Sequence, residues 1–333
     1  MACNLAIAGV TGAVGREFLK ILEQRVFPFD SAKMLASRRS AGKKIEFKGK
    51  QYIIEELTKD SFERIDIALF SAGGDRSKEF APAAAKSGAV VVDNSSAFRM
   101  DPDVPLVIPE INPEKIKEHK GIIANPNCST IIGIVPVWPL HKANPVKRMV
   151  VSTYQAASGA GMQAMLELEN QSREILEGKE PTCKAFPYQI AFNVFSHNSK
   201  LDASGYNLEE VKMVNETRKI FDCPDIAITC TCIRIPVFRA HCESINLEFT
   251  DPITPDQVRD LLSTAPGVSV LDDRKNNRFP MPIDATDKDD IFVGRIRQDE
   301  SIPDNRGINI WVAGDQLRKG AALNAVQIAE KLL

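Results

Sequence analysis

Along residues 1–127, short apolar runs alternate with segments whose apolar residues recur at helical spacing. The runs that we predict to be strands are Leu5–Gly9, Lys33–Ser37, Ile67–Ser71, Ala89–Asp93 and Gly121–Ala124. The segments that we predict to be helices are Val14–Arg25 and Ser77–Ser87. Apolar strands that alternate with helices are typical of a buried parallel sheet with helices on both faces. We therefore predict an α/β fold class, with a Rossmann-like parallel sheet in an N-terminal domain.

After residue 127 the pattern changes to longer strands in which apolar and polar positions alternate. We predict strands at Lys147–Gln155, Ile226–Pro236, Ser244–Phe249 and Ile308–Ala313. We predict helices at Thr130–Pro139, Met162–Glu177 and Leu208–Phe221, and loops in the polar stretches Thr182–Ser204 and Asp272–Asp290. Long strands with interleaved helices indicate an α+β domain built on a mixed sheet.

The last segment with a helical pattern, Gln316–Leu333, is amphipathic, and we expect it to return to the first domain. The first domain then comprises residues 1–127 and 314–333, and the second comprises residues 128–313. A length of 333 residues fits two domains, since a typical domain has about 150 residues.

Charge and hydropathy exclude several classes of protein. Lys and Arg number 42 and Asp and Glu number 44, so no excess of cations exists to bind nucleic acid. The longest apolar run, Ile131–Leu140, is interrupted by Gly133, Pro136 and Pro139 and is shorter than the ~20 residues of a membrane helix. No basic and apolar leader opens the sequence. We expect a cytoplasmic protein, or a plastid one if a transit peptide has been removed.

The cysteines do not predict a disulfide framework or a metal site. Their number is seven, and an odd number in a chain of this length suits a reducing compartment. Cys230 and Cys232 stand near His241 and Cys242, but this spacing is not one that zinc sites use. We expect no metal.

The first predicted strand and helix are joined by the glycine-rich turn Gly9–Gly15. Such a turn presents backbone amides and a helix N-terminus to a pyrophosphate, which makes Thr11, Gly12, Ala13 and Val14 candidate cofactor contacts. The alternative is a tight turn without a ligand, because the spacing is not the usual G-x-G-x-x-G.

The turn after the second predicted strand reads Ser37-Arg38-Arg39-Ser40. An acidic residue there would bind the ribose 2′-hydroxyl of NAD, whereas arginine favours the 2′-phosphate of NADP. Arg39 and Ser40 are therefore candidate phosphate contacts, and the alternative is a solvated basic turn. Ser71, which ends another apolar run and precedes Ala-Gly-Gly, is a further candidate for close approach of the cofactor, and the alternative is a plain loop.

Cys128 follows a predicted strand and precedes a predicted helix. The positive end of a helix dipole favours the thiolate, which is a good nucleophile for acyl chemistry. The alternative is a buried inert cysteine.

Six separated motifs resemble those of the aspartate-β-semialdehyde dehydrogenases, in their bacterial and plant-type branch. They are Pro126–Thr130, Gly9–Gly15, Asp93–Arg99, Ser152–Gly159, Arg234–His241 and Gly314–Ala322. The resemblance runs in order from residue 4 to residue 333. It implies NADPH-dependent reductive dephosphorylation of L-aspartyl-4-phosphate to L-aspartate-4-semialdehyde, on the route to lysine, threonine, methionine and isoleucine. It also implies a second domain that carries catalysis and dimerisation, in a homodimer or a tetramer.

The resemblance also implies roles for individual residues. Cys128 would be the nucleophile that forms a thioester, His241 the acid and base, and Gln155 the residue that orients the substrate. The implied anion ligands are Arg234 for the substrate carboxylate, and Arg99 and Lys212 for phosphate. Glu209 or its neighbour Glu210 would meet the substrate ammonium. Ser158 and Gly159 would approach the nicotinamide, and Gln316 would close over the cofactor.

Two other functions compete with this reading. N-acetyl-γ-glutamyl-phosphate reductase uses the same thioester chemistry, but an N-acetyl group needs no acidic partner such as Glu209. A non-catalytic NADP-binding sensor would also use the glycine-rich turn, but it needs neither Cys128 nor His241.

Overall fold

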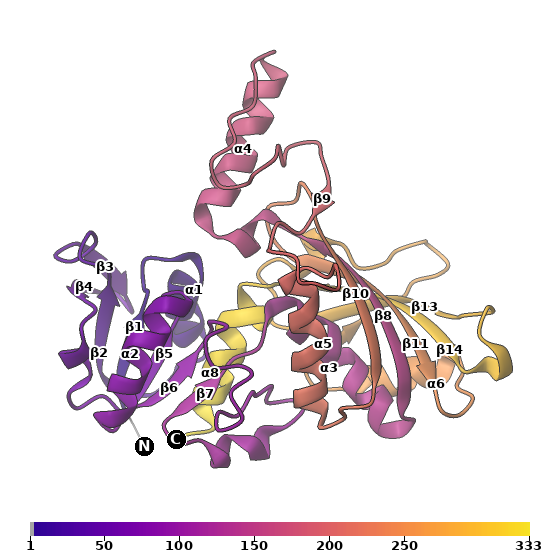
Figure 1. The fold of residues 1–333 in the computed structure, drawn as a ribbon, viewed down its shortest axis with the longest axis horizontal. Helices are drawn as coiled ribbons and strands as arrows, with labels where there is room; N and C mark the ends of the chain where they lie inside the picture. The colour runs from indigo at the N-terminus through magenta and orange to yellow at the C-terminus, as the bar shows by residue number, and fades with distance from the viewer. Residues whose placement is uncertain (1–2) are drawn as a thin grey trace. The chain divides into compact units, whose positions relative to one another are not determined.

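The computed structural model describes residues 3–333 and divides them into two compact units (Figure 1). The first unit comprises the described residues up to Asn127 together with Ala321–Leu333, and the second comprises Cys128–Gly320. None of the helices in residues 3–333 combines the length and apolar composition that a membrane span requires.

The first unit is built on a seven-stranded sheet with the order β3-β4-β2-β1-β5-β6-β7. Its strands are β1 (Cys3–Ala8), β2 (Phe29–Ala36), β3 (Lys44–Phe47), β4 (Lys50–Glu56), β5 (Ile67–Phe70), β6 (Val90–Asp93) and β7 (Ile122–Ala124). All neighbours are parallel except β3 and β4, which form an antiparallel hairpin. The predicted Rossmann-like sheet is confirmed, and the β3–β4 hairpin is an addition to it.

Helices cover both faces of this sheet, as the continuous apolar strands predicted. They are α1 (Ala13–Gln24), α2 (Gly74–Lys86), α8 (Leu323–Glu330) and the 3-10 helices η1 (Lys59–Phe62) and η2 (Pro113–Glu118). Alternate residues of β1 enter two separate cores: Leu5 and Ile7 pack with α1 and α8, whereas Ala6 and Ala8 pack with α2. Helix α8 therefore belongs to the core of the first unit.

The second unit contains a mixed sheet with the order β12-β13-β14-β11-β8-β10-β9. Its strands are β8 (Val146–Gln155), β9 (Phe195–Ser196), β10 (Ala227–Arg234), β11 (His241–Phe249), β12 (Val268–Val270), β13 (Ile291–Gln298) and β14 (Gly307–Gly314). Strands β8 and β10 are parallel, as are β12 and β13, and the other neighbours are antiparallel. The predicted mixed sheet is confirmed.

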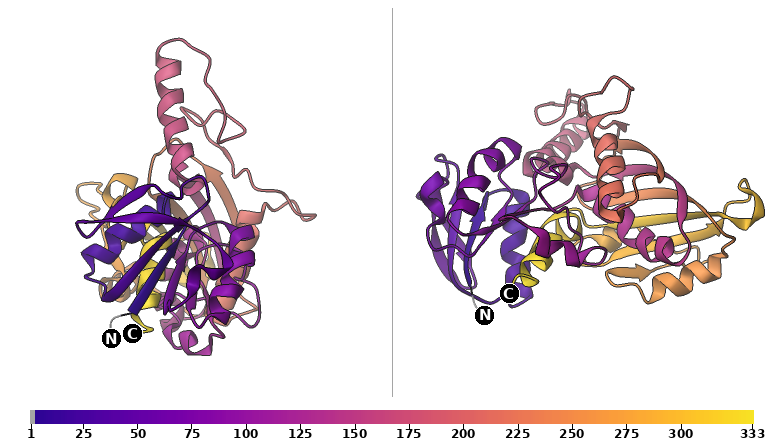
Figure 2. Two further views of the ribbon diagram at one scale, coloured as in Figure 1. Left: turned by 90° about the vertical axis from the view of Figure 1, so that its left-hand side faces the viewer. Right: turned by 60° about the horizontal axis from the view of Figure 1, so that its bottom comes forward.

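The helices of the second unit are α3 (Cys128–Ala143), α4 (Met162–Leu176), α5 (Leu208–Phe221), α6 (Pro255–Ser263) and the short α7 (Pro282–Ala285), with the 3-10 helices η3 (Ala157–Ala160) and η4 (Pro303–Asn305). Helix α3 is apolar on nearly all sides, because it packs against the sheet and against α5 (Figure 1). Figure 2 shows α4 projecting from the rest of its unit.

Three sequence predictions need correction in detail. The predicted helix Gln316–Leu333 is a π-helical turn, Arg318–Ala322, followed by α8. The predicted loop Asp272–Asp290 contains α7, and the predicted loop Thr182–Ser204 contains β9. Strands β12 and β13 and helix α6 had not been predicted; in β13 a bulge between Gly294 and Arg297 breaks the alternation of apolar and polar residues.

Candidate active site

Cys128 is the first residue of α3, and its Sγ lies 3.6 Å from Nε2 of His241. His241 is the first residue of β11 and is fully buried. Strand β11 packs against α3, so the two side chains meet although 113 residues separate them. The structure thus brings the predicted nucleophile and the predicted acid and base into direct contact.

The hydrogen bonds of His241 indicate where its ring proton lies. The backbone N–H of Ala156 donates to Nδ1 over 3.0 Å, so in the neutral ring the proton is on Nε2, which faces the sulfur. Burial, followed by the positive charge of Arg234, lowers the pKa of His241 to about 3. The imidazole is therefore neutral near pH 7 and presents an N–H group to Cys128.

The corner that precedes His241 is held by side chains from the segment after β14. Ala240 has a φ of +72°, in the left-handed region that non-glycine residues seldom adopt. Its N–H donates to Oε1 of Gln316 over 2.8 Å, and the Gln316 amide donates to the hydroxyl of Ser158. Gln316, predicted to contact the cofactor, thus has both ends of its amide bound to Ala240 and Ser158.

Gln155, the last residue of β8, is buried next to the start of α3. Its Nε2 donates to Oγ of Ser129 over 2.6 Å and lies 3.4 Å from Oε1 of Glu209. The predicted orienting glutamine and the predicted ammonium ligand are therefore neighbours.

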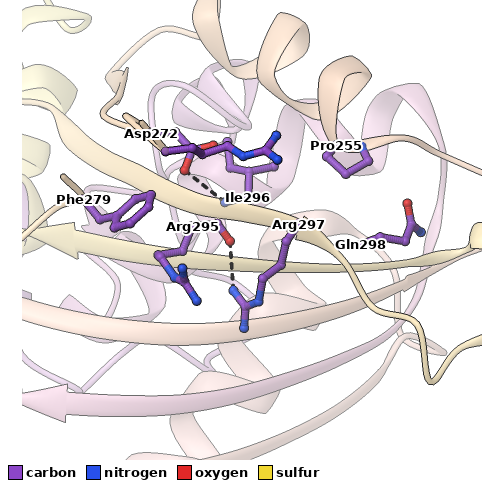
Figure 3. Close-up of a pocket in the computed structure, with 8 residues that line it drawn as sticks. Pro255, Asp272, Phe279, Arg295, Ile296, Arg297 and Gln298 are labelled. Carbon is purple, nitrogen blue, oxygen red and sulfur yellow. Dashed lines mark hydrogen bonds between the residues drawn. The ribbon is translucent and has the colours of Figure 1, made fainter. Parts of the chain in front are cut away.

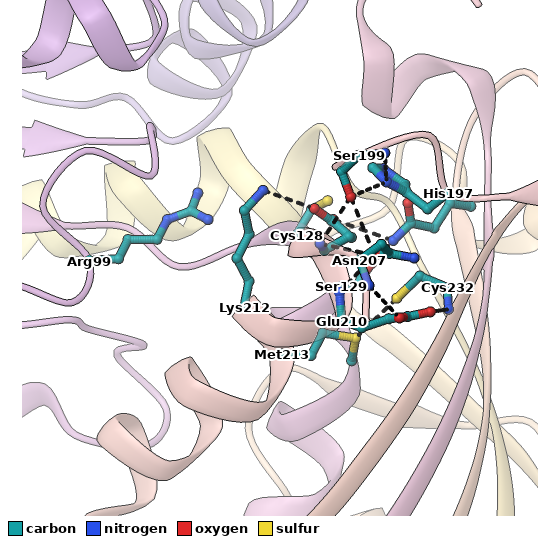
Figure 4. A network of polar contacts seen from close by, with 12 residues as sticks. Arg99, Cys128, Ser129, His197, Ser199, Asn207, Glu210, Lys212, Met213 and Cys232 are labelled. Carbon is teal, nitrogen blue, oxygen red and sulfur yellow. Dashed lines mark hydrogen bonds and ion pairs between the residues drawn. The ribbon is translucent and has the colours of Figure 1, made fainter. Parts of the chain in front are cut away.

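At the start of α5, Glu209 and Glu210 have different hydrogen-bond partners; Figure 4 shows Glu210 beside Asn207 and Cys232. Asn207 caps the helix, and the Glu210 carboxylate accepts the N–H of Asn207 and the N–H of Cys232, each over 2.9 Å. Both Glu210 oxygens are thus bound to backbone amides. Glu209 Oε2 instead accepts from Nζ of Lys212 over 3.0 Å, because residues three apart lie on one face of a helix.

Arg234, the last residue of β10, is buried on the other side of the site. Its Nη1 donates to the carbonyl of Ala156 over 3.1 Å, and its Nη2 donates to Nε2 of His197 over 2.9 Å. Its Nε has no protein partner among the described residues. His197 falls in the predicted loop Thr182–Ser204, and no periodicity or motif in the sequence marked its contact with Arg234.

Gly159 lies directly against two of these side chains. A Cβ at this position would be 2.9 Å from Nη1 of Arg234 and 3.1 Å from Nε2 of His241, closer than ordinary contacts allow. Because Gly159 has no side chain, this position in η3 leaves room for the Arg234 guanidinium and the His241 ring.

In the first unit, the glycine-rich turn fits a dinucleotide. Strand β1 lies between β2 and β5, and the crevice at the carboxyl ends of such strands is where doubly wound sheets bind nucleotides. Gly9 has a φ of +90°, and a Cβ there would lie 2.2 Å from the carbonyl oxygen of Ser71. Among the candidate contacts, Thr11 and Gly12 are exposed and Ala13 and Val14 half-buried at the start of α1.

The other predicted residues of the first unit have these positions. Arg39 is exposed on the turn after β2 and has no ion-pair partner in residues 3–333, while Ser40 is buried and its N–H bonds to the carbonyl of Ser37. Arg99 is buried, and it donates to the carbonyls of Asn94 and Asn125 over 2.8 and 2.9 Å.

A separate cavity of about 170 Å³ lies near the bulge in β13 (Figure 3). Its lining includes Arg274, Arg295 and Arg297, with the Arg295 guanidinium 5.1 Å from the ring centre of Phe279. No cysteine or histidine lines this cavity, so it lacks the groups for acyl transfer.

Comparisons with known proteins indicate one family along nearly the whole chain. The family model "Semialdehyde dehydrogenase, NAD binding domain" matches residues 4–119, and "Semialdehyde dehydrogenase, dimerisation domain" matches residues 137–319. The aspartate-semialdehyde dehydrogenase of Synechocystis sp. is 56% identical over 99% of this chain and 97% of its own length. That of Aquifex aeolicus is 54% identical, over 100% of this chain and 98% of its own.

Solved structures of aspartate-semialdehyde dehydrogenases share the fold of this chain. Aspartate semialdehyde dehydrogenase II from Vibrio cholerae, complexed with ASA, has a TM-score of 0.97 and 45% identity, over 100% of this chain and 98% of that one. The enzyme of Candida albicans with NADP has a TM-score of 0.76 at 23% identity, over 100% of this chain and 98% of that one, and shows the shared fold.

Proposed function

The chain belongs to the aspartate-semialdehyde dehydrogenase family, and we propose that it reduces L-aspartyl-4-phosphate to L-aspartate-4-semialdehyde with NADPH, releasing phosphate. The observation that carries this proposal is the 3.6 Å contact between Cys128 Sγ and His241 Nε2. A nucleophile at a helix N-terminus beside an N–H donor is the arrangement that acyl transfer to sulfur needs.

The Cys128 thiolate attacks the acyl carbon, and the carbon–oxygen bond to phosphate breaks with its electron pair, which leaves a thioester. The bound NADPH supplies the hydride that reduces this thioester. When the resulting thiohemiacetal collapses, the carbon–sulfur bond breaks, the thiolate returns and the aldehyde leaves. We assign the acid and base to His241, because the N–H of its Nε2 faces the sulfur. This group would donate its proton to the oxyanion of the thiohemiacetal and take it back when the thiohemiacetal collapses. We assign to Gln155 the positioning of the acyl group.

The charged groups of the second unit suit an α-amino acid. Arg234 has an unpartnered buried Nε and a planar donor fork, which suits the α-carboxylate. Glu209 would take the α-ammonium, because the Glu210 carboxylate is occupied by two backbone amides. We assign the substrate phosphate to Lys212 and Arg99. An acidic ligand for the ammonium favours this substrate over an N-acetylated one.

The first unit supplies residues that fit the cofactor. Thr11, Gly12, Ala13 and Val14 stand at the start of α1, whose first amides have no side-chain cap and suit a pyrophosphate. The unpaired Arg39 beside Ser40 suits a 2′-phosphate, so we propose NADP rather than NAD. Ser71 would lie along the cofactor, and Ser158 and Gly159 would receive the nicotinamide.

We further propose that the protein is a homodimer that serves the biosynthesis of lysine, threonine, methionine and isoleucine. The second family model carries the name of a dimerisation domain, which supports the assembly. The tetramer that the resemblance also allowed has no support beyond it.

The reverse reaction tests the proposed function. Phosphate-dependent reduction of NADP by L-aspartate semialdehyde should be seen with the wild type and should vanish in Cys128→Ala. N-acetylglutamate semialdehyde should be inert. A wild type that binds NADPH but shows no activity with L-aspartate semialdehyde would rule out the proposal, and activity with the N-acetyl aldehyde would indicate the rival reductase.

A further inference from the structure

His197 lies just after β9 and joins two parts of the second unit. Its backbone N–H donates to the carbonyl of Cys232 over 2.8 Å, which fixes the segment beside β10. Its side chain then reaches Arg234 on one side, with 2.9 Å between Nε2 and Nη2, and Ser199 on the other, with 3.0 Å between Nδ1 and Oγ. The imidazole is thus a bridge between the end of β10 and the segment before α5.

The bonding partners indicate the state of this ring. A guanidinium can only donate, so Nε2 of His197 accepts and the neutral ring carries its proton on Nδ1. Burial and the nearby positive charges of Arg234 and Lys212 lower the pKa of His197 to about 4, against an opposing effect of Glu209. The ring is therefore a neutral acceptor for Arg234 near pH 7.

Ser199 carries the connection on to α5. Its Oγ accepts the Glu209 N–H over 3.2 Å and donates to Oδ1 of the capping residue Asn207 over 3.3 Å (Figure 4). With its proton on Nδ1, His197 donates to this hydroxyl over 3.0 Å. The Ser199 N–H also lies 3.2 Å from Nδ1, but it cannot donate to a nitrogen that carries a proton, so in this tautomer the contact with the hydroxyl is the hydrogen bond. A continuous series of hydrogen bonds thus leads from Arg234 to Glu209.

We propose that His197 is a positioning residue for substrate recognition, which holds the Arg234 guanidinium in place and, through Ser199, sets its position relative to Glu209. This inference rests on the proposed function, in which Arg234 takes the α-carboxylate and Glu209 the α-ammonium. Apart from His197, the guanidinium of Arg234 donates one hydrogen bond among the described residues, from Nη1 to the Ala156 carbonyl, and lies 5.7 Å from the ring centre of Phe186. The bond to His197 is therefore the second directional contact that sets the plane of the fork. Bidentate binding of a carboxylate requires the plane of the fork to be fixed.

The test compares His197→Leu, which removes the acceptor, with His197→Gln, whose amide oxygen can accept near the position of Nε2. For His197→Leu, we expect KM for L-aspartate semialdehyde to rise about 10- to 100-fold, the usual worth of a hydrogen bond to a charged group. We expect kcat and the KM values for phosphate and NADP to change less than about threefold. His197→Gln should restore most of the lost affinity.

A second measurement tests the geometry rather than the affinity. The preference for L- over D-aspartate semialdehyde should fall in His197→Leu, because discrimination requires both α-groups to be held at a set spacing. Ser199→Ala should reduce this preference in the same direction, since it interrupts the connection to α5.

The possible outcomes distinguish a failure of the positioning role of His197 from a failure of the proposed function. An active wild type with unchanged KM and stereochemical preference in His197→Leu would overturn the positioning role and leave the proposed function intact. A uniform rise of all three KM values, not rescued by His197→Gln, would show a merely structural role and would also overturn it. An inactive wild type would overturn the proposed function and this inference with it.

Discussion

Glu243 gives a prediction about stability that follows from burial alone. It lies on β11, two residues after His241 and on the same face, and it is fully buried. Neither carboxylate oxygen has a hydrogen-bond partner among the described residues, and a Cβ on Gly133 of α3 would lie 2.5 Å from Oε2. Burial raises the pKa of this carboxyl well above its ordinary value. The folded protein therefore keeps the proton on Glu243 to a higher pH than the unfolded chain does.

The sign and size of the effect follow from proton linkage. Below the ordinary carboxyl pKa, the folded and unfolded states are both protonated and no free energy is lost. As the pH rises, the unfolded chain releases the proton first, so the free energy of unfolding falls by about 1.4 kcal/mol per pH unit until the raised pKa is reached. For a unit of about 200 residues, this corresponds to roughly 3–6 °C in Tm for each pH unit.

Glu243→Gln removes the titrating group and keeps its shape. The variant should resemble the wild type near pH 4 and become progressively more stable than the wild type as the pH rises. Urea unfolding followed by tryptophan fluorescence reports on this unit, because both tryptophans, Trp138 and Trp311, lie in it. Glu300→Gln, at an exposed position, is the matched control. A difference between variant and wild type that does not depend on pH would refute the reasoning.

Three further substitutions test the site. Gly159→Ala places a methyl group against Arg234 and His241. We expect kcat/KM for L-aspartate semialdehyde to fall about tenfold or more, while the midpoint of urea unfolding stays nearly unchanged. Wild-type kinetics in this variant would contradict the close packing. Gln316→Ala removes the acceptor of the strained Ala240 N–H, so kcat in steady-state assays should fall about tenfold. Arg39→Glu should raise KM for NADP about 10- to 100-fold and shift the NADP to NAD ratio toward NAD, and an unchanged ratio would place the 2′-phosphate elsewhere.

Local patterns explain why much of the active site could be predicted. Cys128 stands at a helix start that the strand before it and the apolar run after it predicted, and α5 has the predicted bounds Leu208–Phe221. Gln155 ends a strand whose alternation is regular from Arg148 onward. In each case a short segment carries the information, because the periodicity of a helix or strand depends on neighbouring residues.

The missed features depend on contacts between distant segments. His197 meets Arg234 through β9, a strand of two residues, which is too short to show any alternation. The choice between Glu209 and Glu210 depends on the Cys232 amide of another strand, and adjacent positions in the sequence could not reveal it. The β3–β4 hairpin was missed because β3 is a short edge strand and most residues of both strands are polar and exposed, unlike the continuous apolar runs used to recognise the rest of the sheet.

The return of the chain to the first unit has a consequence for its synthesis. Leu323, Val326 and Ala329 of α8 share a core with Leu5 and Ile7 of β1. A ribosome must therefore complete about 190 intervening residues before α8 can join α1 in covering this face of the first sheet, which takes roughly 10–40 s at about 5–20 residues per second. During that interval, the part of the apolar face that α8 covers stays exposed in the nascent first unit while the second unit is free to fold. The dinucleotide-binding half is thus translated first and completed last, and its newly made chain is the part that most needs protection by chaperones.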